Sequence, residues 1–202
     1  MRSPPRPRTE PRGTLVVISG PSGSGKTTIC AQIAQKPGVW KSISTTTRRP
    51  GPGEVNGQNY HFKSKEEFEQ GLRDGAFIEH AEYRGNLYGT LRAPLEAHLK
   101  QGRICLLEID VQGALQLMPL FPDGVFIFVM PPNEETLRER LAARARDRTE
   151  EIEARLAVAQ KEMEYRRRYG YGVVNDDLSA AVQEVWDIIQ NRVRAKEGVR
   201  QR

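Results

Sequence analysis

The segment "TLVVISGPSGSGKTTIC", Thr14 to Cys30, decides the fold of this chain of 202 residues. It opens with an apolar, β-branched run that predicts a short buried strand, and it closes with a stretch that has helical spacing. Between the two, "GPSGSGKT" at 20–27 matches the pattern G-x-x-x-x-G-K-[ST]. The match is specific because it follows a strand and opens a helix, which is the context that a phosphate-binding P-loop requires.

The P-loop predicts a nucleoside triphosphate and Mg²⁺ as ligands. Its glycines let successive backbone N–H groups point at phosphate oxygens, assisted by the positive end of the following helix. We expect Lys26 to reach the β- and γ-phosphates and the Thr27 hydroxyl to ligate Mg²⁺. The ATP-binding residues expected in this segment are Gly20, Pro21, Ser22, Gly23, Ser24, Gly25, Lys26, Thr27 and Thr28. The motif alone leaves open whether water or another acceptor receives the γ-phosphoryl group.

The remaining pattern predicts an α/β fold with a parallel sheet. "RICLLEID" at 103–110 and "GVFIFVM" at 124–130 are nearly continuous apolar runs, as expected for strands that are covered on both faces. Helical segments alternate with them, and long charged helices are expected at about 150–169 and 178–196. Between 40 and 90 short extended pieces separated by glycine predict an inserted, mostly β subdomain.

We therefore expect one domain over 14–196, a P-loop NTPase core of three layers that carries the insert and a helical lid. The expected ranges are 14–39, 91–132 and 170–196 for the core, about 40–90 for the insert and about 133–169 for the lid, with a disordered basic tail at 1–13 and a basic tail at 197–202.

Charge and composition restrict the partners. The formal net charge is +5, but the first 13 residues contribute +3 and the last 12 contribute +4, so the middle of the chain is slightly acidic. We interpret the ends as solvated tails and do not expect a nucleic acid as partner. No apolar run approaches the ~18 residues of a membrane span, and the N-terminus lacks a secretion signal, so we expect a cytoplasmic protein without a membrane partner. Cys30 and Cys105 lie in apolar patterns, which predicts reduced core residues.

The stretch "SISTTTRRPGPGEVNGQNYHF" at 42–62 suits a phosphomonoester. Arg48 stands beside three threonines, and Tyr60 and Tyr88 belong to the same insert. A guanidinium fork and phenolic hydroxyls can converge on one phosphate group. The insert therefore predicts the site of a phosphorylated acceptor.

Other polar residues suit the base of that acceptor. Ser44, Glu79 and Thr90 lie in the insert, and Asp110 ends a buried strand. Carboxylates can accept from the N1–H and N2–H₂ donors of guanine, while hydroxyls can donate to its O6. Adenine would instead place its N1 lone pair against a carboxylate, and sites of this kind reject the wrong partner by roughly 10⁴-fold.

At these residues the sequence resembles the guanylate kinases, the nucleoside monophosphate kinases that phosphorylate GMP. The resemblance covers roughly Thr14 to Gln190, through "GPSGSGKTT", "SISTTTRRPGPGEVNGQNYHF", "FIEHAEYRGNLYGT", "EIDVQG", "PPNEETLRERLAAR" and "VVNDDL" in family order. It implies reversible, Mg²⁺-dependent transfer of the γ-phosphoryl group of ATP to GMP in purine nucleotide metabolism, giving ADP and GDP. It leaves dGMP as a second acceptor open, and likewise a monomer or a dimer.

The resemblance also assigns residues. It implies guanine contacts from Ser44, Glu79, Thr90 and Asp110, phosphate contacts from Arg48, Tyr60 and Tyr88, and a position near adenine for Asn175. The residues expected to surround the transferred group are Lys26, Arg48, Arg140, Arg144 and Arg155. Because the phosphate of GMP is ionised near neutral pH, transfer requires alignment and charge neutralisation and no general base.

Three departures from the family pattern stand out. Gly51 replaces a second phosphate-binding arginine, for which Arg49 could partly substitute. The strand end reads Glu108-Ile109-Asp110 where the family usually has D-I-D, and 145–147 reads Ala-Arg-Asp where it often has G-T-E. We expect these changes to affect one phosphate contact, the reach of one carboxylate and the flexibility of the lid.

Three other functions compete with this hypothesis. Guanylate kinase-like domains without activity serve as protein interaction modules, but the P-loop with Lys26 is intact here. A nucleic-acid-dependent NTPase would use the basic ends and show a steep salt dependence of binding. An adenylate or pyrimidine monophosphate kinase would have no reason for paired carboxylates at the base.

The P-loop generates the first prediction. Lys26→Ala removes the cation expected at the β- and γ-phosphates, so phosphoryl transfer should be abolished while the fold stays intact. Steady-state kinetics and circular dichroism check both statements. Turnover like that of the unmodified protein would contradict the role given to Lys26.

Overall fold

The strand that precedes the P-loop lies at the centre of a five-stranded parallel sheet. The computed structural model describes residues 13–144 and 149–200. The strand order is β2 (Val39–Lys41), β7 (Ile104–Glu108), β1 (Thr14–Ser19), β8 (Val125–Met130) and β9 (Tyr171–Val174). All neighbouring pairs run parallel. Every residue of β1 is buried, which explains its nearly uninterrupted apolar sequence.

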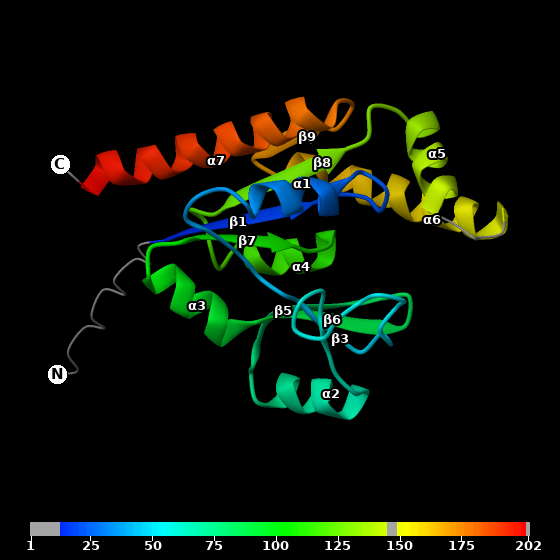
Figure 1. Cartoon of the computed structure of the whole chain (residues 1–202), viewed down its shortest axis with the longest axis horizontal. Helices are drawn as coiled ribbons and strands as arrows, with labels where there is room; N and C mark the ends of the chain where they lie inside the picture. Colours follow the sequence, from blue (N-terminus) through cyan, green and yellow to red (C-terminus); the bar gives the residue numbers. More distant parts are fainter. Residues whose placement is uncertain (1–12, 145–148, 201–202) are drawn as a thin grey trace.

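Helices cover both faces of this sheet (Figure 1). On one face, α1 (Lys26–Ile33) and α7 (Leu178–Arg200) pack through buried residues such as Ile29 and Val185. On the other face, α3 (Arg92–Lys100) and α4 (Val111–Leu117) pack through Leu95 and Ala114. The predicted three-layer α/β core is confirmed, and both cysteines are buried and free, as expected.

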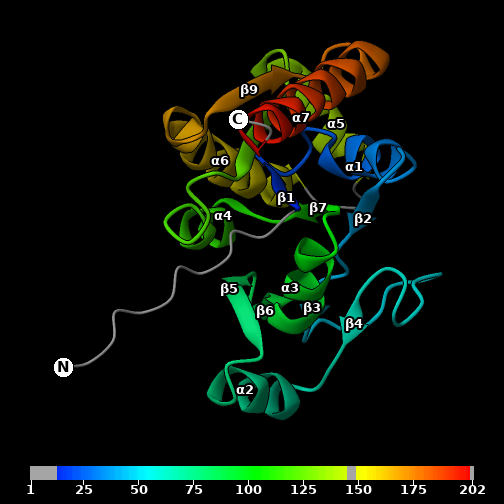
Figure 2. The same ribbon diagram turned by 90° about the vertical axis from the view of Figure 1, so that its left-hand side faces the viewer.

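The predicted insert contains a second, smaller sheet. Its strand order is β4 (His61–Phe62), β3 (Thr45–Thr46), β6 (Asn86–Leu91) and β5 (Phe77–Tyr83), and α2 (Lys65–Arg73) packs against it. Phe68 of α2 is fully buried and its ring stacks on Phe77 with a centroid distance of 4.3 Å. The chain enters the insert after β2 and leaves it at α3 (Figures 1 and 2).

The predicted lid is helical. It consists of α5 (Glu134–Arg144), α6 (Thr149–Glu164) and a short 3₁₀ helix, Tyr165–Arg168. Leu137 and Leu141 of α5 pack against Leu156 and Ala159 of α6 in a small apolar cluster of their own. This cluster is separate from the two clusters of the main sheet, so α5 and α6 share a small core of their own.

Three element boundaries differ from the predicted ranges. β2 pairs with β7 up to Lys41, so the main sheet extends two residues beyond position 39. The helix expected to reach 169 ends at Glu164 and is followed by the 3₁₀ turn. α7 runs to Arg200, into the range expected as a tail. Ala145, Arg146 and Asp147 lie outside the described residues.

Of the helices in the described part of the chain, none combines the length and the hydropathy that a membrane span requires.

Candidate active site

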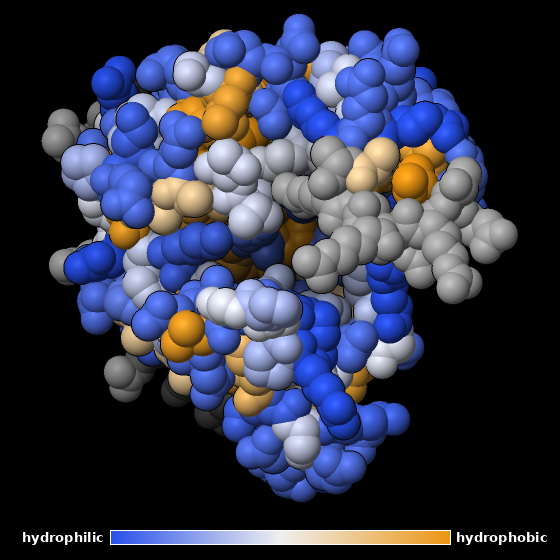
Figure 3. Space-filling model, turned by 45° about the vertical axis from the view of Figure 1, so that its right-hand side comes forward, coloured by the Kyte–Doolittle hydropathy of each residue, from blue (hydrophilic) through white to orange (hydrophobic). Residues whose placement is uncertain are grey.

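A cavity of about 260 Å³ lies between the P-loop and the insert. Figure 3 shows this face of the molecule hollowed between the body of the core and the insert below it. The cavity is lined by groups from both sides, including Lys26 and Thr27 of the P-loop, Ser44, Tyr60, Glu79 and Tyr88 of the insert, and Asp110. The structure thus brings most of the P-loop residues predicted for the donor and most of the residues predicted for the acceptor to one cavity.

The P-loop is held in shape from inside and outside. Lys26 Nζ donates to the carbonyl oxygens of Gly20 at 2.6 Å and Pro21 at 2.8 Å. The buried amide of Asn175 donates to Ser24 O at 2.8 Å. Gly25 has φ +92°, and a Cβ there would clash with the Asn175 amide, so this contact depends on glycine. Asn175 therefore supports the P-loop directly.

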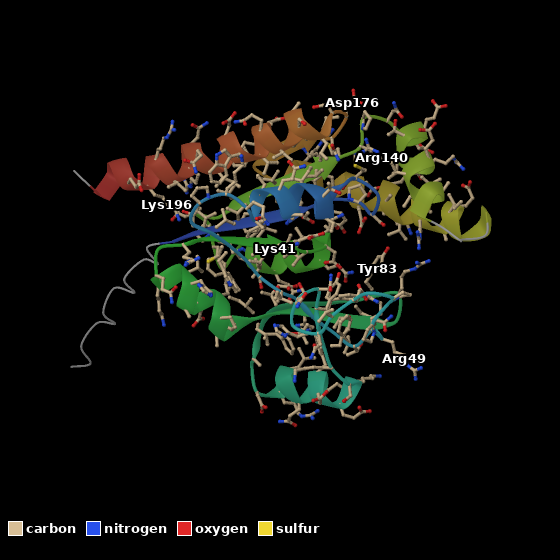
Figure 4. The ribbon with its side chains drawn as sticks, viewed as in Figure 1. Lys41, Arg49, Tyr83, Arg140, Asp176 and Lys196 are labelled. Atoms are coloured by element: carbon tan, nitrogen blue, oxygen red, sulfur yellow. The ribbon has the colours of Figure 1, made fainter. Side chains whose placement is uncertain are left out.

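A second hollow of about 330 Å³ lies on the outer side of the P-loop. It is lined by Gly23, Gly25, Thr28, Arg140, Asn175, Asp176 and Leu178. Arg140 Nη1 donates to Asn175 O at 3.0 Å, and Figure 4 shows Arg140 of α5 close to Asp176. This is where the structure places the two residues that were expected near the adenine and the triphosphate.

Thr27 and Lys41 meet at the carboxylate of Glu108. The Thr27 hydroxyl donates to Glu108 Oε1 at 2.6 Å, and Lys41 Nζ forms an ion pair with Oε2 at 2.8 Å. Sequence reasoning noted Glu108 only as a departure from the family pattern and missed Lys41. An acidic residue at the end of the strand beside the P-loop strand is the signal that could have found Glu108, because P-loop enzymes place a Mg²⁺-binding carboxylate there.

Glu79 is a deeply buried carboxyl group, with only 4% of the residue exposed. Thr90, its neighbour in the β5–β6 pairing, donates to Glu79 Oε1 at 2.6 Å. Burial raises the pKa of Glu79 to about 7; the Thr90 hydrogen bond opposes this shift and the negative charge of Asp110 adds to it. Gly113 of α4 leaves the space that the carboxylate needs, since a Cβ there would clash with it.

Asp110 caps α4 and faces the same cavity. Its side chain accepts from the backbone N–H of Gly113 at 2.9 Å. Burial raises its pKa, while the hydrogen bonds from Gly113 and Gln112 and the charge of Lys26 lower it. Two carboxyl groups, one from β5 of the insert and one from the start of α4, therefore line the cavity together with Ser44, and Thr90 binds the first of them.

Arg48 is engaged by an acidic partner that sequence reasoning missed. Its Nη2 pairs with Glu54 Oε1 at 2.7 Å, and its guanidinium lies over the ring of Tyr60, 5.3 Å from the centroid. The hydrogen bond and the charge of Glu54 raise the pKa of Arg48 against the effect of burial. The other Glu54 oxygen accepts from the backbone N–H of Gly51 at 2.6 Å. The tyrosine rings of 60 and 88 meet edge to face at 6.1 Å.

Arg49 does not take the place of the arginine that Gly51 replaces. Its side chain is exposed and points outward from the insert (Figure 4), and it does not line the cavity. Only its carbonyl oxygen contacts Arg48, accepting from Nη1 at 2.9 Å.

Two of the three predicted lid arginines can be placed relative to the cavity. Arg140 lines the second hollow, and Arg155 of α6 is half-buried. Arg144 is the last residue of α5, and its side chain lies outside the described residues. Neither Arg140 nor Arg155 lines the first cavity. Two residues that the sequence did not single out, Tyr83 and Glu162, do line it.

The comparisons agree with this geometry. The guanylate kinase family model matches residues 12–192 of the chain. The chain belongs to the guanylate kinase family. It is 47% identical over 179 residues to a guanylate kinase from Clostridium perfringens, which covers 88% of this chain and 83% of that protein. It is 46% identical over 179 residues to the guanylate kinase of Caldanaerobacter subterraneus, with 88% and 87% covered.

A solved structure agrees as well. The crystal structure of guanylate kinase from Anaplasma phagocytophilum superposes with a TM-score of 0.74 and 34% sequence identity, covering 89% of this chain and 85% of that one. The family resemblance predicted from the motifs is confirmed by these relatives.

The buried Glu79 generates a prediction about stability. The raised pKa means that the folded protein binds a proton between the ordinary value of 4.5 and about 7 that the unfolded chain has released. The free energy of unfolding should therefore fall as pH rises from 4.5 to 7, by roughly 3 kcal/mol for this shift. Glu79→Gln removes the titration and should flatten this slope in urea unfolding curves.

The matched control is Glu82→Gln, on the same strand but exposed. Its pH profile should follow that of the unmodified protein. Equal slopes for all three proteins would show that Glu79 ionises as freely as an exposed carboxyl group.

Proposed function

We propose that the chain catalyses the reversible transfer of the γ-phosphoryl group of ATP to GMP, giving ADP and GDP. One observation carries the proposal. A single cavity has a P-loop on one wall and, on the other, a buried carboxyl group hydrogen-bonded to a hydroxyl beside an arginine–tyrosine cluster. A hydrolase needs only the first wall; the second provides for an acceptor that has both a base and a phosphate.

Glu79 and Asp110 recognise the guanine edge in this proposal. The ionised carboxylates accept from N1–H and N2–H₂, and the Ser44 hydroxyl donates to O6, while Thr90 contributes by orienting Glu79, to which its one hydroxyl proton is already donated. Because Glu79 already holds the Thr90 hydroxyl, the pair is oriented before the base arrives. The exocyclic group of adenine and its N1 lone pair would leave these buried groups unpaired, which gives the discrimination.

The phosphate of GMP binds at Arg48, Tyr60 and Tyr88. In the structure the Glu54 carboxylate forms an ion pair with the Arg48 guanidinium and accepts a hydrogen bond from the Gly51 N–H. Both groups are donors of the kind that also bind a phosphate. Arg48 keeps further N–H groups for the phosphate, and the ion pair with Glu54 fixes its orientation. With Arg49 turned outward, Arg48 is the arginine that this part of the insert supplies.

Mg²⁺ fits the Thr27–Glu108 pair. A hydroxyl and a carboxylate at hydrogen-bond distance are oxygen donors of the kind that this ion prefers. When bound with ATP, the ion neutralises charge on the β- and γ-phosphates. Lys41 keeps the other Glu108 oxygen engaged and so holds the carboxylate toward Thr27.

Transfer then requires alignment. A GMP phosphate oxygen forms a bond to the γ-phosphorus while the bond from that phosphorus to the bridging oxygen of ADP breaks. Lys26 moves from the Gly20 and Pro21 carbonyls to the phosphates, and Arg140, Arg144 and Arg155 supply positive charge as the lid closes. Adenine occupies the second hollow beside Asn175 in this arrangement. In this proposal the chain is divided into core, insert and lid, and the insert and the lid are the parts that move.

One assay tests the proposal. Release of nucleoside diphosphate is coupled to NADH oxidation, with ATP as donor and GMP, dGMP, AMP, UMP or dTMP as acceptor. We expect turnover with GMP that exceeds the turnover with AMP or a pyrimidine nucleotide by about 10³-fold or more. ATP hydrolysis without any need for an acceptor, or an equal rate with AMP, would contradict the proposal.

A further inference from the structure

Glu162 is a half-buried carboxylate that the mechanism above does not use. It lies near the end of α6 and is the residue of this helix that lines the first cavity. One of its oxygens, Oε2, is buried and accepts no hydrogen bond from any group in 13–144 or 149–200. A buried acceptor without a donor destabilises the fold, so its presence at a substrate cavity indicates that a hydrogen-bond donor reaches it in another state of the protein.

The P-loop affects the ionisation of this carboxylate. Burial raises the pKa of Glu162, whereas the charge of Lys26 and a hydrogen bond from the backbone N–H of Ser22 lower it. Asp110 faces it from the end of the main sheet and adds to the upward shift. Glu162 therefore lies at the cavity that the P-loop also lines, and its Oε2 atom has no donor among the described residues.

Tyr83 brings a hydroxyl donor to the same cavity. It ends β5 in the insert and lines the same cavity, and Figure 4 shows it projecting from the β5–β6 hairpin toward α6. Burial raises its pKa, the negative charge of Glu162 raises it further, and the positive charges of Arg84 and Arg155 lower it. The phenol thus lies within the electrostatic reach of both Glu162 and Arg155. No hydrogen bond joins Tyr83 to Glu162 in the described structure.

Helix geometry connects this pair to the transferred group. Arg155 and Glu162 are seven residues apart on α6, about two turns, and so lie on one face of the helix. A contact that fixes Glu162 also fixes the rotation of α6 about its axis. Arg155 follows that rotation, so a contact at Glu162 also sets the direction of the Arg155 side chain.

We propose that Tyr83 and Glu162 form a latch between the insert and the lid. When GMP draws the insert toward the core, the Tyr83 hydroxyl donates to the Oε2 atom of Glu162. The latch joins the insert to the lid helix beside the P-loop, and it positions Arg155. Both residues are positioning residues, and the proposal rests on the proposed transfer to GMP.

The kinetic test uses Tyr83→Phe, Glu162→Gln and the double variant. Tyr83→Phe removes only the hydroxyl, and Glu162→Gln leaves an oxygen acceptor but removes the charge that strengthens the bond. Each single change should raise the KM for GMP about tenfold and leave the KM for ATP within about twofold. The KM for GMP of the double variant should not exceed that of the more impaired single variant, because both changes remove the same bond.

Matched controls come from the adjacent residues. Glu164→Gln and Tyr165→Phe change the same residue types at exposed positions beside Glu162. Both should behave like the unmodified protein. Additive effects in the double variant, or equal effects in the control pair, would overturn the latch.

A distance measurement separates this proposal from the proposed function. Nitroxide labels at Lys161→Cys on α6 and Arg73→Cys on α2, both exposed, report the separation of lid and insert, while the native cysteines are buried. Saturating GMP with a non-hydrolysable ATP analogue should shorten this distance, and Tyr83→Phe should shift the distribution back toward the unliganded one. If the unmodified protein transfers phosphate to GMP but Tyr83→Phe closes equally well, the latch is wrong and the function stands; absence of transfer to GMP contradicts the function itself.

Discussion

The hydrogen bond between Thr90 and the buried Glu79 carboxyl group is the interaction on which the proposed specificity depends. Burying a carboxyl group is unfavourable, and the raised pKa expresses that penalty. Two features of the fold make this hydrogen bond possible. The β5–β6 register sets Thr90 opposite Glu79, and Gly113 leaves space for the Glu79 oxygens. Perturbed carboxyl groups of this kind gather at functional sites. The same arrangement that costs stability provides an acceptor aimed at a base.

The cations and donors of the site already have protein partners in this structure. Glu54 pairs with Arg48, and Glu108 binds Thr27 and Lys41. Because these carboxylates satisfy groups that phosphates and Mg²⁺ are proposed to use, the unliganded site does not leave charges uncompensated. Substrate binding then exchanges partners, which lowers the net gain from each contact but orients every group in advance.

The sequence predicted those features of the fold that depend on a local pattern of residues. The P-loop was found because a strand, a glycine-rich turn and a helix are contiguous, and the layered core follows from the buried strands. The grouping of Glu79 and Thr90 was predicted from chemistry and family resemblance, although their pairing depends on the hairpin register. Lys41, Tyr83 and Glu162 were missed because their neighbours in space are distant in the sequence. Pairing of β2 with β7 brings Lys41 to Glu108, and the fold brings Tyr83 of β5 and Glu162 of α6 to one cavity. The outward direction of Arg49 likewise depends on the backbone of its loop.

The most direct test of the guanine pocket is calorimetric titration of the unmodified protein with GMP, IMP and AMP at pH 8, where Glu79 is ionised. IMP lacks the 2-amino donor of GMP, and AMP lacks the N1–H donor as well. If buried carboxylates hold the base by these donors, GMP should bind at least about tenfold more tightly than IMP, and AMP should bind too weakly to measure. Equal affinities for the three nucleotides would contradict the account.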